Sequence, residues 1–318
     1  MITRLHREAF RAMGTECLIA AAARPAHSRA ARRALAAARE EIAACERTLS
    51  RFDGRSDLTR LNARAGEWVS ADERLLGALA AALRAREATE GRFDPTILPA
   101  LVAAGYDRTF EELGSRPARV ARGWRAGAVV ELDRAGGRAR VERGAAADLG
   151  GIGKGFSASR AVGAMLCEAP ELVGVLVDLG GDIAVWGSPP GGGPWRIAVA
   201  DPRRPGLTLG MLGLEAGAVA TSGRDRRRFG PVRELHHLID PATGAPAAAG
   251  PLAVTVVAPD AAAAEAHATA LAISTLAEAR AHVSSFPELA ALYVPETGEI
   301  SKLGRLPLLG PLREEVSA

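Results

Sequence analysis

Cysteine, lysine and long apolar runs are all scarce in this sequence. Its three cysteines, Cys17, Cys45 and Cys167, are odd in number and far apart, which argues against a disulfide framework and against a zinc site built on paired cysteines. No stretch of roughly 18 uninterrupted apolar residues is present, so we expect no transmembrane segment. Residues 1–8 are charged where a signal peptide needs an apolar run, and we therefore expect a cytoplasmic protein.

Lysine is almost absent among the basic residues. Of the 40 lysines and arginines, only Lys154 and Lys302 are lysine, and the arginines are interleaved with acidic residues along the chain. The formal net charge of +3 therefore does not indicate nucleic-acid binding. An arginine in so arginine-rich a chain is weak evidence of function. Lys154 is more informative, because its compact ammonium lies in a tight glycine-rich turn where a planar guanidinium would not replace it.

The length of 318 residues and a hydrophobic share of 48% allow a large core. Helical spacing of apolar residues is found mainly in the first third of the chain and strand-like runs mainly in the second half, which predicts the α+β class. We expect a single domain over residues 1–318, with a helix-rich part at about 1–110 and a strand-rich part at about 111–318.

The periodicity of the sequence predicts its main elements. Ser56 is expected to cap a short helix. Helices are expected at about 28–48, 57–62, 72–89, 155–168 and 260–273, a strand or hairpin at 8–22, exposed strands within 114–146, and further strands at 173–179, 195–200, 216–221, 235–239 and 252–258.

The segment from Asp148 to Gly155, Asp-Leu-Gly-Gly-Ile-Gly-Lys-Gly, is the first candidate for chemistry. Glycines free backbone N–H groups to converge on an anion, and the positive end of the following helix adds to the attraction, so a pyrophosphate would fit here. The segment is not a Walker loop, which needs glycine in place of Asp148 and serine or threonine in place of Gly155. A helix entry that merely needs a tight turn explains the same residues equally well.

Two segments of the second half carry polar groups at strand ends. Thr221-Ser222-Gly223 precedes an arginine cluster and suits a phosphate or the edge of a flavin, although the arginines alone are typical of a solvated loop. His236 and His237 lie on opposite faces of a predicted strand, so at most one of them faces a site. A lone strand histidine is more often structural than catalytic.

Glu265 and Thr269 lie on one face of a predicted helix, with alanines around them. A carboxylate and a hydroxyl among small side chains suit a hard cation such as Mg²⁺, although Glu265 taken alone is more typical of a surface charge. His267 faces elsewhere, and the sequence offers no convincing third ligand for a zinc site with His236 or His237.

Taken in order, these segments resemble the ApbE family, the FAD:protein FMN transferases. The resemblance rests on seven motifs: Met13-Gly14-Thr15, the segment from Ser50 to Asn62, Phe93-Asp94-Pro95-Thr96, the segment from Asp148 to Gly155, Leu179-Gly180-Gly181-Asp182, Thr221-Ser222-Gly223, and the segment from His237 to Gly244.

The resemblance implies a fold and a reaction. The fold would be of the ApbE type, similar to a T-fold, with mixed and mostly antiparallel sheets, packed helices and an FAD cleft between two lobes. The reaction would be the Mg²⁺-dependent transfer of FMN from FAD to a threonine or serine hydroxyl of an acceptor flavoprotein, with release of AMP. The same resemblance implies an FAD site lined by Met13, Phe52, Arg92, Phe93, Asp94, Asp148, Lys154, Ser222 and Ile239, a Mg²⁺ site formed by the carbonyl of Gly151 with Glu265 and Thr269, and His237 as the candidate base.

Two positions depart from the family pattern. Glu265 stands where the family usually has aspartate, and Ala268 stands at a second position that is often aspartate. These departures leave two alternatives open. One is an FAD pyrophosphatase, which uses water as the acceptor, and the other is an FAD-binding protein with weakened catalysis.

Overall fold

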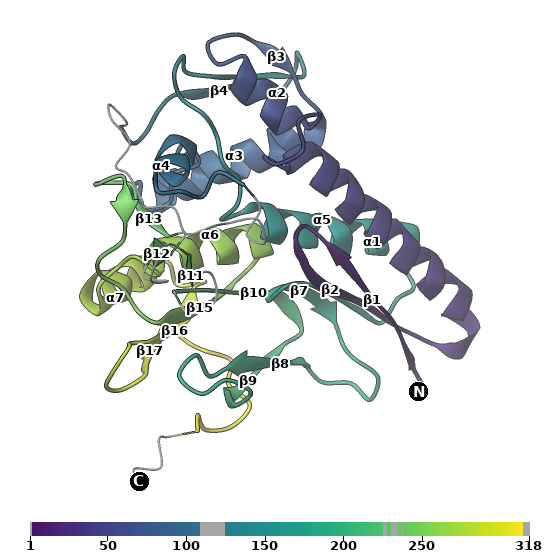
Figure 1. The fold of residues 1–318 in the computed structure, drawn as a ribbon. Coiled ribbons are helices and arrows are strands. Elements are labelled where there is room, and N and C mark those ends of the chain that lie inside the picture. Colours follow the sequence, from purple (N-terminus) through teal and green to yellow (C-terminus); the bar gives the residue numbers. More distant parts are fainter. Residues whose placement is uncertain (1, 109–124, 225–227, 230–234, 237, 314–318) are drawn as a thin grey trace.

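A computed structural model describes residues 2–108, 125–224, 228–229, 235–236 and 238–313. Its centre is an eight-stranded antiparallel sheet with the strand order β1-β2-β6-β7-β10-β15-β16-β17 (Figure 1). The strands are β1 Arg4–Ala12, β2 Thr15–Ala23, β6 Gly174–Leu179, β7 Asp182–Gly187, β10 Ala216–Gly223, β15 Ala253–Ala258, β16 Ala290–Val294 and β17 Ser301–Leu303.

The first two strands form a hairpin where the sequence predicted a strand or hairpin over residues 8–22, and its turn consists of Met13 and Gly14. Both residues have a positive φ, 51° for Met13 and 69° for Gly14, which is the backbone of a two-residue turn that follows the twist of the strands. A methionine rarely adopts this conformation, so the turn holds Met13 in place at some local cost. The backbone N–H of Met13 donates to Glu46 Oε1 at 2.6 Å, which fixes the hairpin tip against helix α1.

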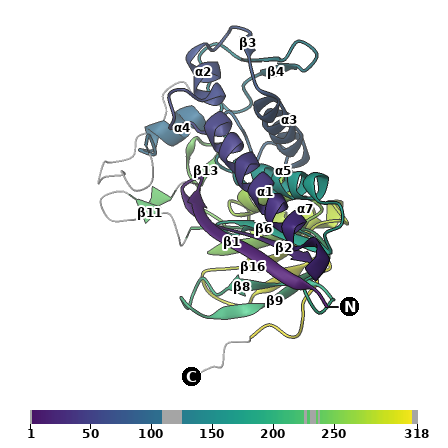
Figure 2. The same cartoon turned by 90° about the vertical axis from the view of Figure 1, so that its right-hand side faces the viewer.

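Three helices cover one face of the large sheet: α1 Ser28–Leu49, α5 Gly153–Glu168 and α6 Ala261–Leu271. The hairpin of β8 Trp195–Ala200 and β9 Thr208–Leu214 packs on the opposite face, where Trp195 and Leu212 are buried in a separate apolar cluster. The sheet therefore lies between a helical layer and a small hairpin (Figures 1 and 2).

Helix α6 separates two apolar cores. Ala264 and Ala268 belong to the core between the helices and the large sheet, whereas Ala262 and Ala266 belong to the core on the other side. Small side chains on every face allow this close packing. Gly155 of α5 shows how close it is, because a Cβ added there would lie 2.0 Å from the carbonyl oxygen of residue 261.

The second core is enclosed by helices and a small three-stranded sheet. These are α2 Asp57–Ala63, α3 Glu73–Ala88, β3 Val69–Ser70, β4 Val130–Asp133 and β5 Arg138–Val141, with the strand order β3-β5-β4. The predicted cap is present, since the Ser56 hydroxyl accepts the backbone N–H of Thr59 at 3.0 Å. The remaining elements are η1 Pro25–His27, α4 Leu98–Ala103, α7 Leu276–Ser285, β11 Arg228–Phe229, β12 Leu235–His236, β13 Ile239–Asp240 and β14 Ala245–Pro246.

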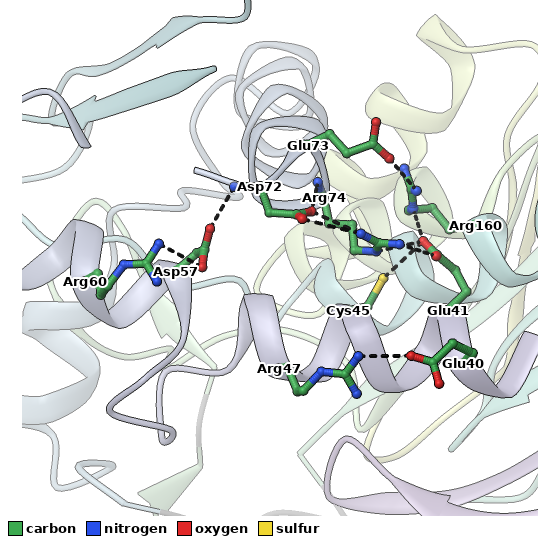
Figure 3. A network of polar contacts seen from close by, with 10 residues as sticks. All are labelled: Glu40, Glu41, Cys45, Arg47, Asp57, Arg60, Asp72, Glu73, Arg74 and Arg160. Atoms are coloured by element: carbon green, nitrogen blue, oxygen red, sulfur yellow. Dashed lines mark hydrogen bonds and ion pairs between the residues drawn. The ribbon is translucent and has the colours of Figure 1, made fainter. Parts of the chain in front are cut away.

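An ionic network joins the helices that enclose these cores (Figure 3). Glu41 of α1 accepts from Arg74 of α3, with Nη2 2.7 Å from Oε2, and also from Arg160 of α5. Arg160 in turn reaches Glu73 at 2.9 Å. Burial by itself raises the pKa of Glu41, but the hydrogen bonds and charges of the two arginines outweigh it, so this pKa lies below its usual value. The network fixes three helices relative to one another.

The α+β class and the mostly antiparallel sheets are confirmed. The sequence missed several elements, among them α4, α7, β7, β9, β16 and β17, and part of the segment 114–146 lies outside the described residues. No helix in the described ranges has both the length and the apolar character needed to span a membrane.

Candidate active site

A cavity of about 590 Å³ opens where the β1–β2 turn, the end of α1, the start of α5 and helix α6 meet. The predicted residues, with one exception, line this single cavity. They are Met13, Phe52, Arg92, Phe93, Asp94, Asp148, Gly151, Lys154, Ser222, Ile239, Glu265 and Thr269. The exception is His237, which lies outside the described residues, although the neighbouring Leu238 and Ile239 line the cavity.

The glycine-rich turn is held by its own aspartate. Asp148 Oδ2 accepts the backbone N–H of Gly150 at 2.9 Å, and the backbone N–H of Asp148 donates to the carbonyl of Pro95 at 2.7 Å. Helix α5 begins shortly afterwards, at Gly153. In its first turn the N–H of Gly155 donates to Glu265 Oε2 at 2.7 Å, so this donor is already satisfied by the protein's own carboxylate. The positive end of α5 therefore stabilises Glu265 directly.

Lys154 lies between two buried carboxylates. Its Nζ is 2.8 Å from Glu265 Oε1 and also contacts Asp182 Oδ2. Both acidic side chains are only 4% exposed, and that of Lys154 is 18% exposed. Asp182 reaches the cluster because the tight turn at Gly180 and Gly181 places it at the start of β7. One ammonium thus pairs with two carboxylates in the cavity wall and offsets the charge of only one of them.

The predicted Mg²⁺ ligands are oxygen atoms close to Glu265. Thr269, one helical turn beyond Glu265 on α6, donates its hydroxyl to the carbonyl of Gly151 at 3.5 Å. A Cβ on Gly151 would lie 3.1 Å from the Thr269 hydroxyl and 3.2 Å from the ring of Phe93, so glycine keeps this carbonyl close to α6. A carbonyl, a hydroxyl and a carboxylate form the type of oxygen set that Mg²⁺ prefers. The donor set therefore fits such an ion.

The described chain contains no group of three or more histidine, cysteine or acidic side chains arranged to hold a metal. His267 illustrates this, since it does not line the cavity and instead lies with Nδ1 2.9 Å from Nε2 of His282 on α7. Burial, followed by the neighbouring His282, lowers the pKa of His267 to about 4, so its imidazole is neutral at neutral pH.

Arg51 is a cavity residue that the sequence analysis missed. Its side chain is 8% exposed, its Nε lies 2.9 Å from Asp148 Oδ1, and its Nη1 donates to the carbonyl of Tyr106 at 3.0 Å. The guanidinium also stacks on two rings, 4.2 Å from the centroid of Phe52 and 4.6 Å from that of Tyr106. Within the described ranges, Nη2 of Arg51 has no hydrogen-bond partner. In so arginine-rich a chain, only the position of Arg51 next to Phe52 could have indicated it.

Asp94 and Arg92 are engaged with the protein itself. Asp94 Oδ1 accepts from the backbone N–H and the hydroxyl of Thr96 at 2.8 and 2.7 Å, and its Oδ2 accepts the N–H of Gly127 at 2.6 Å. Arg92, a third of whose side chain is exposed, pairs with Glu278 at 3.5 Å. Asp94 therefore shapes the wall of the cavity, and its contact with FAD stays a prediction.

Comparison with known proteins gives a consistent result. The model of the ApbE family matches residues 13–293. The FAD:protein FMN transferase of Treponema pallidum is 32% identical over 276 residues, which are 78% of this chain and 73% of that protein. The crystal structure of the ApbE protein of Thermotoga maritima superposes with a TM-score of 0.82 at 31% identity, covering 94% of this chain and 97% of the other. The apo form of the Pseudomonas stutzeri flavinyl transferase ApbE, at 21% identity, shares the fold with a TM-score of 0.79, covering 95% of this chain and 96% of the other.

Proposed function

This chain belongs to the ApbE family, and on that premise we propose that it is an FAD:protein FMN transferase. One observation carries the proposal: residues from distant parts of the sequence that the motifs assign to FAD and Mg²⁺ line the same cavity. The relatives' names supply the reaction, and the cavity supplies the place where it would occur.

The wall of the cavity offers both cationic and aromatic groups for a flavin dinucleotide. Arg51, Arg92 and Lys154 carry positive charge, which attracts the pyrophosphate of FAD. The exposed ring of Phe52 and the apolar side chain of Met13 offer surfaces on which a planar ring can lie.

In the proposed transfer, a threonine or serine hydroxyl of the acceptor flavoprotein attacks the phosphorus on the FMN side of the pyrophosphate. The bond between this phosphorus and the bridging oxygen breaks, AMP leaves with the bridging oxygen, and a phosphodiester links FMN to the acceptor. His237 is proposed as the base that accepts the hydroxyl proton. Lys154 would offset charge on the pyrophosphate as the bond breaks.

Gly151, Glu265 and Thr269 are the residues proposed to hold Mg²⁺. When bound there, the ion would withdraw charge from the phosphate oxygens. The chain's own part is to place a carbonyl, a hydroxyl and a carboxylate together on α6 and the adjacent turn.

The test is a transfer assay read by mass spectrometry. The purified protein is incubated with FAD, Mg²⁺ and an acceptor domain that carries a candidate threonine. The mass of the acceptor is measured before and after the incubation. Gain of FMN on the acceptor supports the transferase, and free FMN with AMP and an unmodified acceptor indicates the pyrophosphatase instead. Bound FAD without turnover, under several divalent metals, would show a flavin-binding protein with weakened catalysis. Lys302→Gln is the matched control for Lys154→Gln, because Lys302 is the only other lysine and is exposed on β17.

A further inference from the structure

Glu265 is engaged on both of its oxygens by the protein itself. Oε1 accepts from Lys154 Nζ at 2.8 Å, and Oε2 accepts from the N–H of Gly155 at 2.7 Å. The side chain is 4% exposed, so within the free protein these two donors replace water as its partners. Glu265, the proposed metal ligand, is thus already paired with the ammonium of Lys154.

The length of the side chain at this position makes the double contact possible. Gly155 N–H and Lys154 Nζ approach the two different oxygens of Glu265 from α5, while the backbone of Glu265 lies on α6. An aspartate is shorter by one methylene group and would draw its carboxylate back toward α6, away from both donors. The glutamate therefore favours the pairing with Lys154.

We propose that Lys154 is a tethered cation that alternates with a divalent metal at Glu265. The proposal rests on the proposed function only for the choice of the metal site. Asp182 and Glu265 together carry two negative charges, and Lys154 carries one positive charge between them. A divalent ion that binds Glu265 while the ammonium stays in place meets strong repulsion at short range. Metal binding therefore requires Lys154 to leave Glu265.

This alternation links the metal to the phosphate-bearing substrate. A pyrophosphate that draws the ammonium of Lys154 toward itself leaves Glu265 free to accept the metal, and a bound metal leaves Lys154 free to contact a phosphate. By thermodynamic reciprocity, each of the two ligands then raises the affinity for the other. Without the substrate, the site is expected to bind metal weakly.

The decisive experiment measures Mn²⁺ binding without FAD. Free Mn²⁺ is followed by electron paramagnetic resonance during titration of the wild-type protein and of the variants Lys154→Gln and Lys302→Gln. Removing the competing ammonium is expected to tighten Mn²⁺ binding at least about tenfold in Lys154→Gln, while Lys302→Gln stays as weak as the wild type. The double variant Lys154→Gln/Glu265→Gln is expected to lose the tighter Mn²⁺ binding of Lys154→Gln. That loss would show that the Mn²⁺ is bound by Glu265.

Equal or weaker Mn²⁺ binding by a folded Lys154→Gln variant would overturn the proposal, as would a gain that survives Glu265→Gln. A second measurement avoids any variant that might unfold. The wild-type protein is treated with a limiting amount of an amine-reactive acetylating reagent, and the extent of acetylation is compared at Lys154 and Lys302. Mn²⁺ is expected to raise the ratio of acetylation at Lys154 to that at Lys302 several-fold. An unchanged or lower ratio at saturating Mn²⁺ would contradict the alternation. Neither experiment depends on flavin transfer, so failure here and failure of the proposed function are distinguishable.

Discussion

Replacing Arg51 by methionine tests whether the ion pair with Asp148 holds the cavity wall. Methionine preserves much of the apolar stem but removes the charge, the 2.9 Å contact with Asp148 Oδ1 and the hydrogen bond to the carbonyl of Tyr106. Removing one partner of a buried ion pair destabilises a protein by about 3–5 kcal/mol. Asp148 keeps the N–H of Gly150 on its other oxygen, so we expect the lower end of that range, about 3 kcal/mol.

The measurement is urea-induced unfolding followed by circular dichroism, with Arg51→Met, Asp148→Asn and the double variant compared with the wild type. In a separate thermal melt, a loss of about 3 kcal/mol corresponds to a fall in Tm of roughly 4–5 °C, because the unfolding entropy is about 2.1 cal/mol/K per residue and the chain has 318 residues. The double variant no longer buries an unpaired carboxylate, so its loss is expected to be smaller than the sum of the single losses by about 2 kcal/mol. Strict additivity, or an Arg51→Met variant as stable as the wild type, would refute the role given to this pair. Flavin fluorescence quenching on the same proteins is expected to show weaker FAD binding by Arg51→Met.

Three further perturbations test other contacts. Gly155→Ala would place a Cβ 2.0 Å from the carbonyl oxygen of Ala261 and is expected to destabilise the protein by about 1–3 kcal/mol or more. Its control, Gly163→Ala in the same helix, meets nothing within 4 Å and is expected to stabilise the protein by about 0.5–1 kcal/mol. Thermal melts that rank the two variants alike would contradict the packing argument. Glu41→Gln removes a carboxylate whose pKa is lowered in the folded state. Such a carboxylate contributes its full stabilisation above the usual pKa of 4.5 and loses this contribution as the pH falls through the lowered pKa. The variant should therefore be less stable at pH 7 and lose less stability than the wild type between about pH 5 and pH 3, and parallel stability curves over that range would be the contrary result. Met13→Asn introduces a residue that also tolerates positive φ, so it is expected to change the free energy of unfolding by less than about 1 kcal/mol. It is also expected to weaken FAD binding in a fluorescence titration. Full FAD affinity in this variant would show that Met13 does not contact FAD.

The helices α1, α2, α3, α5 and α6 and the region of the first hairpin could be predicted because their patterns are local. The buried side of α1 is marked by the helical spacing of its apolar residues Ala34, Leu35, Ala38 and Ile42. The N-cap of α2 is indicated by Ser56. The strands β16 and β17 were missed because β16 is buried throughout and shows no alternation, while β17 has only three residues. Their places next to β15 at one end of the large sheet depend on long-range pairing, which periodicity does not report.

Recognition of ordered motifs located the cavity, but it did not reveal the contacts within it. Glu265 taken alone looked like a surface charge, whereas it is buried, because Lys154 and the N–H of Gly155 compensate it from another helix. Arg51 was overlooked because, apart from its position next to Phe52, nothing in the sequence distinguishes a stacked, buried guanidinium from the many exposed ones. Both cases depend on pairs of residues far apart in the chain, here Glu265 with Lys154 and Arg51 with Asp148.

The position of α6 between two cores has a consequence for how this protein loses its site. Residues Glu265 and Thr269 lie on a helix whose alanines pack on both sides, so the helix cannot open without disrupting both cores. Its amide protons should therefore exchange with solvent only through global unfolding, unlike those of a surface loop. A population of partly opened molecules with a damaged site is not expected on heating. The protein should instead keep its full binding capacity until the cooperative transition and lose it in one step.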